Sequence, residues 1–356
     1  MSESKITVEE KLLIERFASV FGFEKLSECL PGNIYPPYLY ITAFIILDWG
    51  IINTYAHVAG DGTHVLLNSP QTVLMAVGLF LAVAGIRYFS TGYTNVVENL
   101  PLDEVDIDPT PFERIVDFRF KLAVYGVAVV GFYVYIITII GLEGIAAADG
   151  TANLINWLFL FQVSYIPVMI EFGVLYFAVQ LLLPRRISYA DIPMFFYDTR
   201  NMGGFAPVGQ LLKYSYYFYT AGLLLYFIKT FGPILFSFGG TTPAGSGPVE
   251  VLVFSVAWLI GVGSIGFSMY TMKRLMSNKK GQEIAEVERE IQEIIENPYD
   301  ISESKISEAD RYEDILLRRQ EIRETRVYPA SFTMWSQIGI SVLLPQAMNI
   351  VVQSVG

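Results

Sequence analysis

Seven long apolar segments constrain the fold of this chain more than any other feature of its sequence. Each approaches the roughly 20 apolar residues that an α-helix needs to cross a lipid bilayer. They cover residues 37–58, 70–93, 120–142, 154–183, 214–238, 249–275 and 329–354. Hydrophobic residues make up 53% of the chain, which is too apolar for an ordinary soluble domain of this length. The sequence therefore predicts an all-α, polytopic membrane protein with seven transmembrane helices.

Basic residues are distributed unevenly between the segments that connect these helices. The linkers at 59–69, 143–153 and 239–248 contain no Lys or Arg. Nearly every basic residue lies in the other connecting segments or at the ends of the spans beside them, including Arg185, Arg186, Lys273, Arg274, Lys279 and Lys280. Because basic loops stay in the cytoplasm, we predict a cytoplasmic N-terminus and, after seven spans, a C-terminus outside. The N-terminal residues lack the order of a signal peptide, so we expect no cleaved leader and a multi-pass location in the plasma (cytoplasmic) membrane.

This orientation and the residue composition exclude several classes of protein. Retinal proteins and G-protein-coupled receptors place the N-terminus outside, and a retinal pump also needs a lysine in its last helix, where 329–354 has none. Two histidines, His57 and His64, and one cysteine, Cys29, are too few for a multi-histidine metal site or an intrachain disulfide. A net charge of −11 argues against a nucleic-acid partner.

No catalytic constellation is visible in the sequence. It contains no Ser-His-Asp set, no HExxH motif, no nucleotide-binding loop and no paired carboxylates. We therefore expect no enzyme activity, no metal and no cofactor. Membrane lipids are the expected partners.

The chain divides into four predicted regions. Residues 1–35 form a cytoplasmic N-terminal region with an amphipathic helix over 7–27, which a capping box of Thr7 and Glu10 would begin. Residues 36–278 hold the first six transmembrane helices and their loops, 279–328 form a cytoplasmic helical hairpin, and 329–356 hold the seventh helix.

The hairpin is predicted from two helical patterns that follow the sixth span. The first pattern ends at Asn297 and Pro298, and the second begins at a Ser307 cap. Apolar residues recur at helical intervals in both, at Ile284, Val287, Ile291 and Ile294 and then at Tyr312, Ile315, Leu316 and Ile322. A charged, solvated connector is the alternative interpretation, since charge-rich helices are common.

Glycines mark a turn between the fourth and fifth spans. Gly203 and Gly204 lie beside Arg200 and precede Pro207 and Gly209. Such a turn could hold a lipid phosphate or another anion, but the Lys and Ser/Thr of a phosphate-binding loop are missing. A structural turn is therefore the favoured interpretation.

Four charged residues lie away from the ends of the predicted spans, at Asp48, Arg87, Glu171 and Lys229. Charges inside a membrane are costly and often functional, so a transport or gating role for Asp48 is one hypothesis. Arg87 and Glu171 fall at a similar depth and are expected to pair. The structural alternatives are that Arg87 and Lys229 reach the interfaces and that Asp48 is buried with Asn53 or a backbone partner.

Polar residues follow one side of the last predicted helix. Gln337, Ser341, Asn349 and Gln353 fall on a spacing of four, and Pro345 occupies the position between Ser341 and Asn349. Gln346 lies close to the same side of the helix. Such a stripe does not face lipid, so it either bonds to neighbouring helices or lines a water-filled pore. In a pore, Val342, Leu343 and Leu344 beside the Pro345 kink would supply a hydrophobic gate.

The seven spans, short outer loops, long cytoplasmic extensions and final helix "FTMWSQIGISVLLPQAMNIVVQ" resemble the insect odorant and gustatory receptor superfamily of seven-transmembrane ion channels. The resemblance implies a homotetramer whose seventh helices form a central pore and whose cytoplasmic helices join the subunits. The family's closing Thr-Tyr and Gln-Phe pattern is not reproduced, because Thr333, Gln346 and Gln353 match it only loosely. The resemblance therefore carries over only a pore-lining role for the last helix.

These observations favour a homo-oligomeric ion channel or channel-like chemoreceptor. Two alternatives stay open: a secondary transporter that uses Asp48, Lys229 and the Arg87–Glu171 pair, and a noncatalytic scaffold that recruits a partner through its cytoplasmic helices. Aromatic residues in the spans form either a pocket for a small-molecule ligand or interfacial belts, namely Tyr133, Tyr135, Trp157, Phe159 and Phe161.

Overall fold

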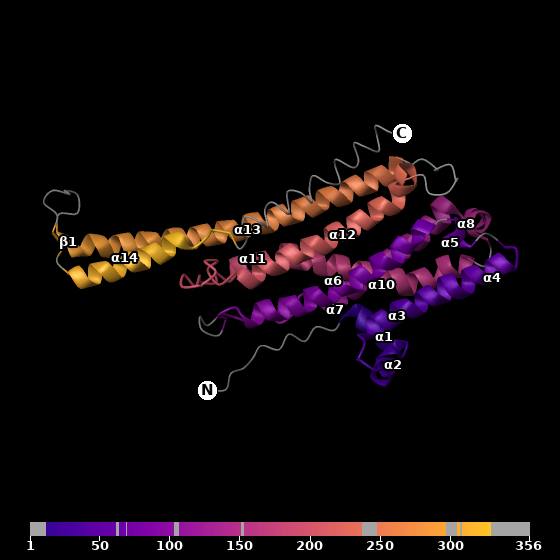
Figure 1. Ribbon diagram of the computed structural model, residues 1–356, viewed down its shortest axis with the longest axis horizontal. Helices are drawn as coiled ribbons and strands as arrows, with labels where there is room; N and C mark the ends of the chain where they lie inside the picture. The colour runs from indigo at the N-terminus through magenta and orange to yellow at the C-terminus, as the bar shows by residue number, and fades with distance from the viewer. Residues whose placement is uncertain are drawn as a thin grey trace.

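The computed structural model is an all-α bundle with one long helical arm (Figure 1). It describes residues 12–61, 64–68, 70–102, 107–150, 153–236, 248–296, 305–306 and 308–328, and 80% of the structure is helical. Five stretches of helix are long and apolar enough to cross a membrane, Pro36–Val58, Val73–Glu98, Phe118–Ile140, Asn156–Tyr189 and Val251–Ile294. The chain therefore has the features of a polytopic membrane protein.

The helices occur in the following order along the chain. The first part contains α1 (Leu13–Val20), α2 (Phe23–Cys29), α3 (Pro36–Ile45), η1 (Ile46–Ile52), α4 (Asn53–Val58), α5 (Val65–Asn68), η2 (Pro70–Thr72) and α6 (Val73–Glu98). The middle part contains α7 (Phe118–Tyr135), η3 (Ile136–Ile140), α8 (Leu142–Asp149), α9 (Asn153–Ile155), η4 (Asn156–Leu160), α10 (Phe161–Phe177), η5 (Ala178–Leu182) and α11 (Leu183–Tyr189). The last part contains α12 (Ala206–Phe236), α13 (Pro248–Ile294), strands β1 (Ile295–Glu296) and β2 (Lys305–Ile306), and α14 (Ala309–Glu324).

Five of the seven predicted segments coincide with these five apolar stretches, namely the first four and the sixth. The fifth segment, 214–238, falls largely within α12, which packs in the same bundle. The seventh segment, 329–354, lies outside the described residues. The length and composition of these helices therefore support a multi-pass membrane protein.

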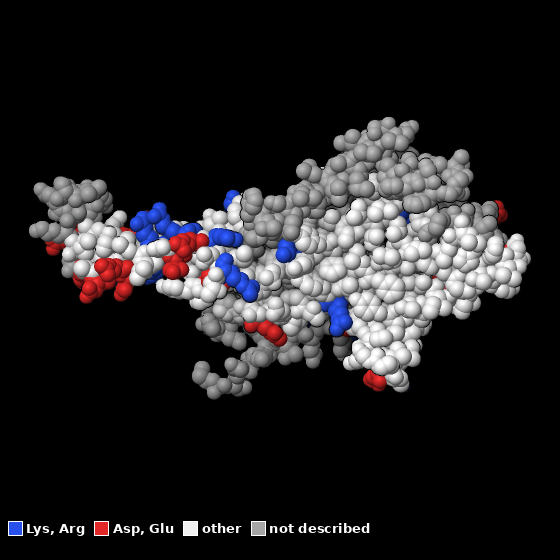
Figure 2. All heavy atoms as spheres, in the orientation of Figure 1, with Lys and Arg blue, Asp and Glu red and all other residues white. Residues whose placement is uncertain are grey.

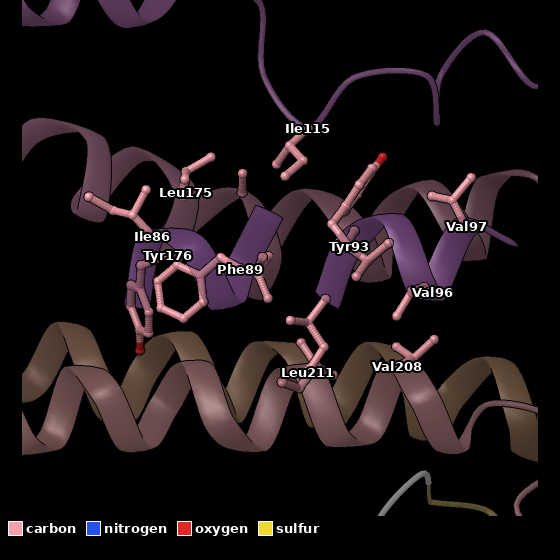
Figure 3. Packing of buried hydrophobic residues seen from close by; sticks show 14 of the residues in the cluster. Ile86, Phe89, Tyr93, Val96, Val97, Ile115, Leu175, Tyr176, Val208 and Leu211 are labelled. Atoms are coloured by element: carbon pink, nitrogen blue, oxygen red, sulfur yellow. The ribbon is translucent and has the colours of Figure 1, made fainter. Parts of the chain in front are cut away.

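The core of the bundle forms around α6, which packs against α10 and α12 (Figure 3). Phe89 of α6 lies next to Tyr176 of α10. Leu211 of α12 approaches α6 at Gly92, where an added Cβ atom would lie 2.7 Å from its Cδ1 atom. A side chain at Gly85 would collide with the ring of Phe172, since an added Cβ atom would lie 2.8 Å from its Cε2 atom. Dispersion contacts between closely packed side chains are a main stabilising force between helices in a membrane.

Helices α13 and α14 form the arm, which extends beyond the bundle and carries most of the charges visible in Figure 2. α13 has 47 residues, or about 70 Å at 1.5 Å per residue, and runs from the bundle into the arm without interruption. The two helices bury a small apolar cluster of Val287, Ile294, Ile315 and Ile322. A short antiparallel ribbon closes the tip, with Ile295 opposite Ile306.

The arm has the helical hairpin geometry that the sequence predicts. Arg318 connects the two helices outside the apolar cluster, with its guanidinium 3.4 Å from the carboxylate of Glu283 and 3.1 Å from that of Glu290. Leu316, predicted to face the partner helix, is exposed instead. The predicted stop at Asn297 and Pro298 and the Ser307 cap lie outside the described part of the chain.

The predicted amphipathic helix over 7–27 is two helices where the structure describes it. α1 and α2 are separated at Gly22, whose φ of +81° is a left-handed conformation that glycine adopts without strain. Leu13, Ile14 and Ala18 are buried, so one side of α1 faces the bundle as the apolar pattern indicates. Thr7 and Glu10 lie outside the described residues, and the residue that precedes α1 is Leu12.

Candidate functional site

Glu171 of α10 anchors the N-terminal helix α1 in the bundle. Its two carboxylate oxygens accept hydrogen bonds from the backbone N–H groups of Leu13 and Ile14, each at 2.8 Å. The Lys121 ammonium lies 3.4 Å from Oε1, and both charged side chains are fully buried. The first N–H groups of a helix lack partners within the helix and carry partial positive charge, so a carboxylate stabilises them.

This arrangement replaces the predicted pairing of Arg87 with Glu171. Arg87 is exposed, and its guanidinium lies over the ring of Tyr35, 4.9 Å from the ring centroid. The Tyr35 hydroxyl donates a hydrogen bond of 2.8 Å to Glu15 of α1. Lys121 was missed because a lysine at the beginning of a predicted span usually reaches the interface. Nothing in the local sequence shows that it turns inward.

Asp48 lies in a second polar cluster inside the bundle. One of its carboxylate oxygens accepts hydrogen bonds from the side-chain amides of Asn53, at 2.9 Å, and Asn156, at 2.7 Å. The Asp48–Asn53 contact was predicted as a structural alternative. Asn156 was missed, because it lies 108 residues further along the chain.

Three of the polar residues inside the bundle lie in π-helical turns. Asp48 belongs to η1, Asn156 to η4 and Gln180 to η5. A π-helical turn inserts a residue into an α-helix and changes the direction of the following side chains, and such turns occur often at functional sites. The backbone therefore turns the Asp48 carboxylate and the Asn156 amide toward each other.

Gln180 joins the fourth apolar stretch to α12 and α13. Its amide nitrogen donates to the Ser215 hydroxyl at 2.7 Å, and its backbone carbonyl accepts from Ser268 at 2.6 Å. One helical turn away, the hydroxyls of Tyr176 and Ser264 lie 2.6 Å apart. These buried groups satisfy one another, which is the pattern expected for polar packing between membrane helices. This cluster therefore has a structural role.

Lys229 of α12 is part-buried. No Asp or Glu side chain in the described segments lies within salt-bridge distance of it. The structure does not bring Lys229 together with Asp48 into one cluster of hydrogen bonds or ion pairs. The four intramembrane charges thus fall into separate environments.

An apolar cavity of about 520 Å³ opens between the N-terminal helices and the bundle. Two of the predicted aromatic residues, Tyr133 and Phe159, line it. Trp157 and Phe161 stack against Phe132 instead, at centroid distances of 6.3 and 4.7 Å. Tyr135 is exposed. The aromatic set thus divides between a cavity, a stacked cluster and the outer surface.

A carboxylate of the chain itself, that of Asp198, binds the backbone N–H groups of the turn at Gly203 and Gly204. Asp198 accepts hydrogen bonds from the backbone N–H groups of Arg200, Met202 and Gly204, at 3.0, 3.2 and 3.1 Å. Burial alone would raise the pKa of Asp198, but these three donors outweigh it and hold the pKa below its usual range. The turn is therefore structural, as the favoured interpretation predicted, and its N–H groups are occupied.

The base of the arm is joined to this turn by hydrogen bonds. The Lys280 ammonium of α13 donates to the backbone carbonyls of Arg323 and Thr325, both at 2.7 Å, where α14 ends. The next residue, Arg326, donates its backbone N–H to the carbonyl of Asn201 at 2.8 Å. An ammonium group at a helix C-terminus neutralises carbonyls that have no partner within the helix. The end of α14 is thus fixed to both α13 and the 196–202 turn.

The predicted pore-lining and gate residues all lie outside the described part of the chain, namely Gln337, Ser341, Val342, Leu343, Leu344, Pro345, Gln346, Asn349 and Gln353. Within the described part, no group of three or more His, Cys, Asp and Glu side chains is placed to hold a metal ion. Comparison with known proteins identifies no relative: no family model, no curated protein and no solved structure matches the chain.

Proposed function

We propose that the protein is a homo-oligomeric ion channel or channel-like chemoreceptor with seven transmembrane helices and a cytoplasmic N-terminus. The last predicted helix, 329–354, lines the pore with its stripe of neutral polar residues. In topology this proposal follows the resemblance to the insect odorant and gustatory receptor superfamily. The subunits would associate as a tetramer in the plasma (cytoplasmic) membrane.

The observation that carries the proposal is the connection between the arm and the last helix. α13 is continuous from the bundle into the arm, and α14 returns the chain to the base of the bundle. Lys280 and Asn201 hold the chain at Thr325 and Arg326, immediately before the predicted pore helix. A displacement of the arm would therefore be transmitted directly to that helix.

The distribution of charge supports the proposed orientation. Arg185, Arg274 and Lys279 line one pocket of about 460 Å³ where the arm meets the bundle, and Lys279 pairs with Asp191 at 2.7 Å. On the face drawn in Figure 2, most basic side chains lie on the arm and around this junction, and few lie over the rest of the bundle. Basic residues remain on the cytoplasmic side of a membrane, so the arm and the N-terminus are assigned to the cytoplasm.

The oligomeric state of the purified protein in nanodiscs tests the proposal, by mass and by particle images. We expect a fourfold ring with the last helix at its axis and a cation conductance in planar bilayers. Asn349→Leu should reduce the conductance, whereas Gln210→Leu, at an exposed position of α12, should leave it unchanged. A monomer, or a conductance that is insensitive to Asn349→Leu, would assign the polar stripe to helix packing.

The Asp48 cluster supports a second candidate function, a proton-coupled secondary transporter. A buried carboxylate among amides is a group that can bind a proton or a small cation within the membrane. In liposomes loaded with a pH-sensitive dye, Asp48→Asn should abolish proton-coupled flux in a transporter. In a channel the same substitution should leave conductance in place, so one variant separates the two functions.

A further inference from the structure

The apolar cavity described above has the construction of a ligand site. Its walls come from the N-terminal helices, the first apolar stretch, α7 and the beginning of the fourth stretch. It is lined by Phe21, Phe23, Phe44, Leu47, Tyr133 and Gln162, among others, and no charged side chain is among the lining residues. Its volume of about 520 Å³ falls within the roughly 300–1,000 Å³ of known small-molecule pockets.

Gln162 is a polar residue in the otherwise largely apolar lining of this cavity. Its side chain is 5% exposed, and its amide nitrogen donates to the backbone carbonyl of Trp157 at 3.1 Å. This hydrogen bond fixes which end of the amide is nitrogen and which is oxygen. The oxygen, Oε1, is buried and has no hydrogen-bond partner among the residues that the structure describes. Buried acceptors without a partner are uncommon in folded proteins, so this oxygen is available to a donor from a bound molecule.

We propose that the cavity binds a small, neutral, largely apolar molecule with one hydroxyl group, whose O–H donates to Oε1 of Gln162. A charged ligand would meet no counter-charge in the lining. A lipid acyl chain would fill the volume but would leave the amide oxygen without a donor. The second polar group of the lining, the Tyr133 hydroxyl, already donates to the backbone carbonyl of Leu158 at 2.6 Å. Gln162 is thus the acceptor that selects the ligand.

The cavity also connects its ligand to the N-terminal helices. Phe21 and Phe23 flank the break at Gly22, and both line the cavity. The first of these two helices, α1, is anchored to the bundle by Glu171. A bound molecule would therefore contact the junction between α1 and α2. This inference goes beyond the proposed channel function. It is tested by binding alone, so its outcome does not depend on whether the protein conducts ions.

A matched pair of probes tests the proposal, naphthol and its methyl ether. They have nearly the same apolar shape, but only naphthol can donate a hydrogen bond. Binding is measured by equilibrium dialysis against the full chain in phosphatidylcholine nanodiscs, with empty nanodiscs to subtract partition into lipid. One hydrogen bond to a buried, otherwise unpaired acceptor corresponds to about a tenfold difference in affinity. We expect naphthol to bind about tenfold more tightly than the ether.

Variants then locate the bound probe. Gln162→Leu should remove the preference for naphthol without weakening the ether, and Gln210→Leu should preserve the preference. Ala43→Trp should displace both probes by filling the cavity; if it does not fold, Ala43→Leu should weaken both in proportion to the lost volume. Equal affinities for the two probes would overturn the proposal and leave lipid chains as the occupant. So would a preference that survives Gln162→Leu.

Discussion

Lys121 and Glu171 form a fully buried ion pair, 3.4 Å from Nζ to Oε1, and the same carboxylate holds the first N–H groups of α1. Removing one partner of a buried pair takes a compensating charge away from the other, which costs about 3–5 kcal/mol. Glu171→Gln should therefore destabilise the protein by several kcal/mol. Lys121→Met should cost less, because two backbone N–H groups still stabilise the carboxylate. Thermal unfolding in detergent measures both changes.

A double-mutant cycle separates this pair from general damage to the bundle. The cost of Glu171→Gln together with Lys121→Met should be smaller than the sum of the single costs, because the two residues interact. Glu28→Gln, at an exposed position of α2, serves as the control and should change stability by less than about 0.5 kcal/mol. Strict additivity of the two buried substitutions would contradict the pairing.

The turn that follows α11 should lose its structure in acid. The pKa of Asp198 is lowered in the folded protein, so its contribution to stability is fully present above the unfolded pKa of about 3.9. It is lost as the pH falls through the lower folded value, since a protonated carboxyl group accepts these N–H bonds less well. Hydrogen exchange at Met202 and Gly204, corrected for the intrinsic effect of pH, should therefore accelerate below that range.

At neutral pH, Asp198→Asn should weaken the turn as acid does in the unsubstituted protein. Exchange at Gly204 should then be fast and should no longer change between acid and neutral solution. Asp310→Asn, at an exposed position in α14, is the matched control. If exchange in the Asp198→Asn variant stays slow, the glycines alone hold the turn and the carboxylate is not required.

The contact between Lys280 and the end of α14 fixes the base of the arm. Lys280→Met removes two hydrogen bonds from a charged donor. Each hydrogen bond of this kind contributes about 1.5–3 kcal/mol to stability. Amide exchange over 321–326 should accelerate by at least tenfold while the middle of α13 keeps its protection. Arg289→Met, at an exposed site on α13, should leave both regions unchanged. Uniform loss of protection along the arm would instead indicate that Lys280 supports the whole hairpin.

The apolar pattern of the sequence was sufficient to predict the helical class and the arm. Hydrophobic segments of membrane length and the spacing of Val287, Ile294, Ile315 and Ile322 depend on local periodicity, which a single sequence carries. The turn at Gly203 was predictable for the same reason, because only local backbone chemistry decides it. The helix break at Gly22 had a signal too, but one glycine inside an amphipathic pattern is ordinarily tolerated.

The partners of the buried polar groups could not be predicted in this way. Asp48 meets Asn156 and Glu171 meets Lys121 across long separations in the chain, so the contacts depend on how helices rotate against each other. The π-helical turns add to this difficulty. Each one inserts a residue into the helix, so the side chains that follow change direction, and it leaves no clear pattern in the sequence. The unpaired oxygen of Gln162 is likewise a property of the packed structure.

Two glycines in α13 offer a sharp test of how the bundle packs. An added Cβ atom at Gly261 would lie 2.5 Å from Cε1 of Tyr219, whereas one at Gly263 would meet nothing within 4 Å. The Tyr219 ring cannot easily move, because its hydroxyl donates to the carbonyl of Ala257 at 2.6 Å and its face stacks on Tyr176. Overpacking of this kind costs about 1–3 kcal/mol.

Gly261→Ala should therefore lower the thermal stability of the protein in detergent. Gly263→Ala introduces the same methyl group two residues away without the collision, and alanine is favoured over glycine in a helix interior by roughly 0.5–1 kcal/mol. That variant should be neutral or slightly more stable. The opposite signs of two identical substitutions would establish that α12 and α13 are in contact at Gly261. If both variants behaved alike, α12 and α13 would lie further apart at Gly261 than the close approach to Tyr219 requires.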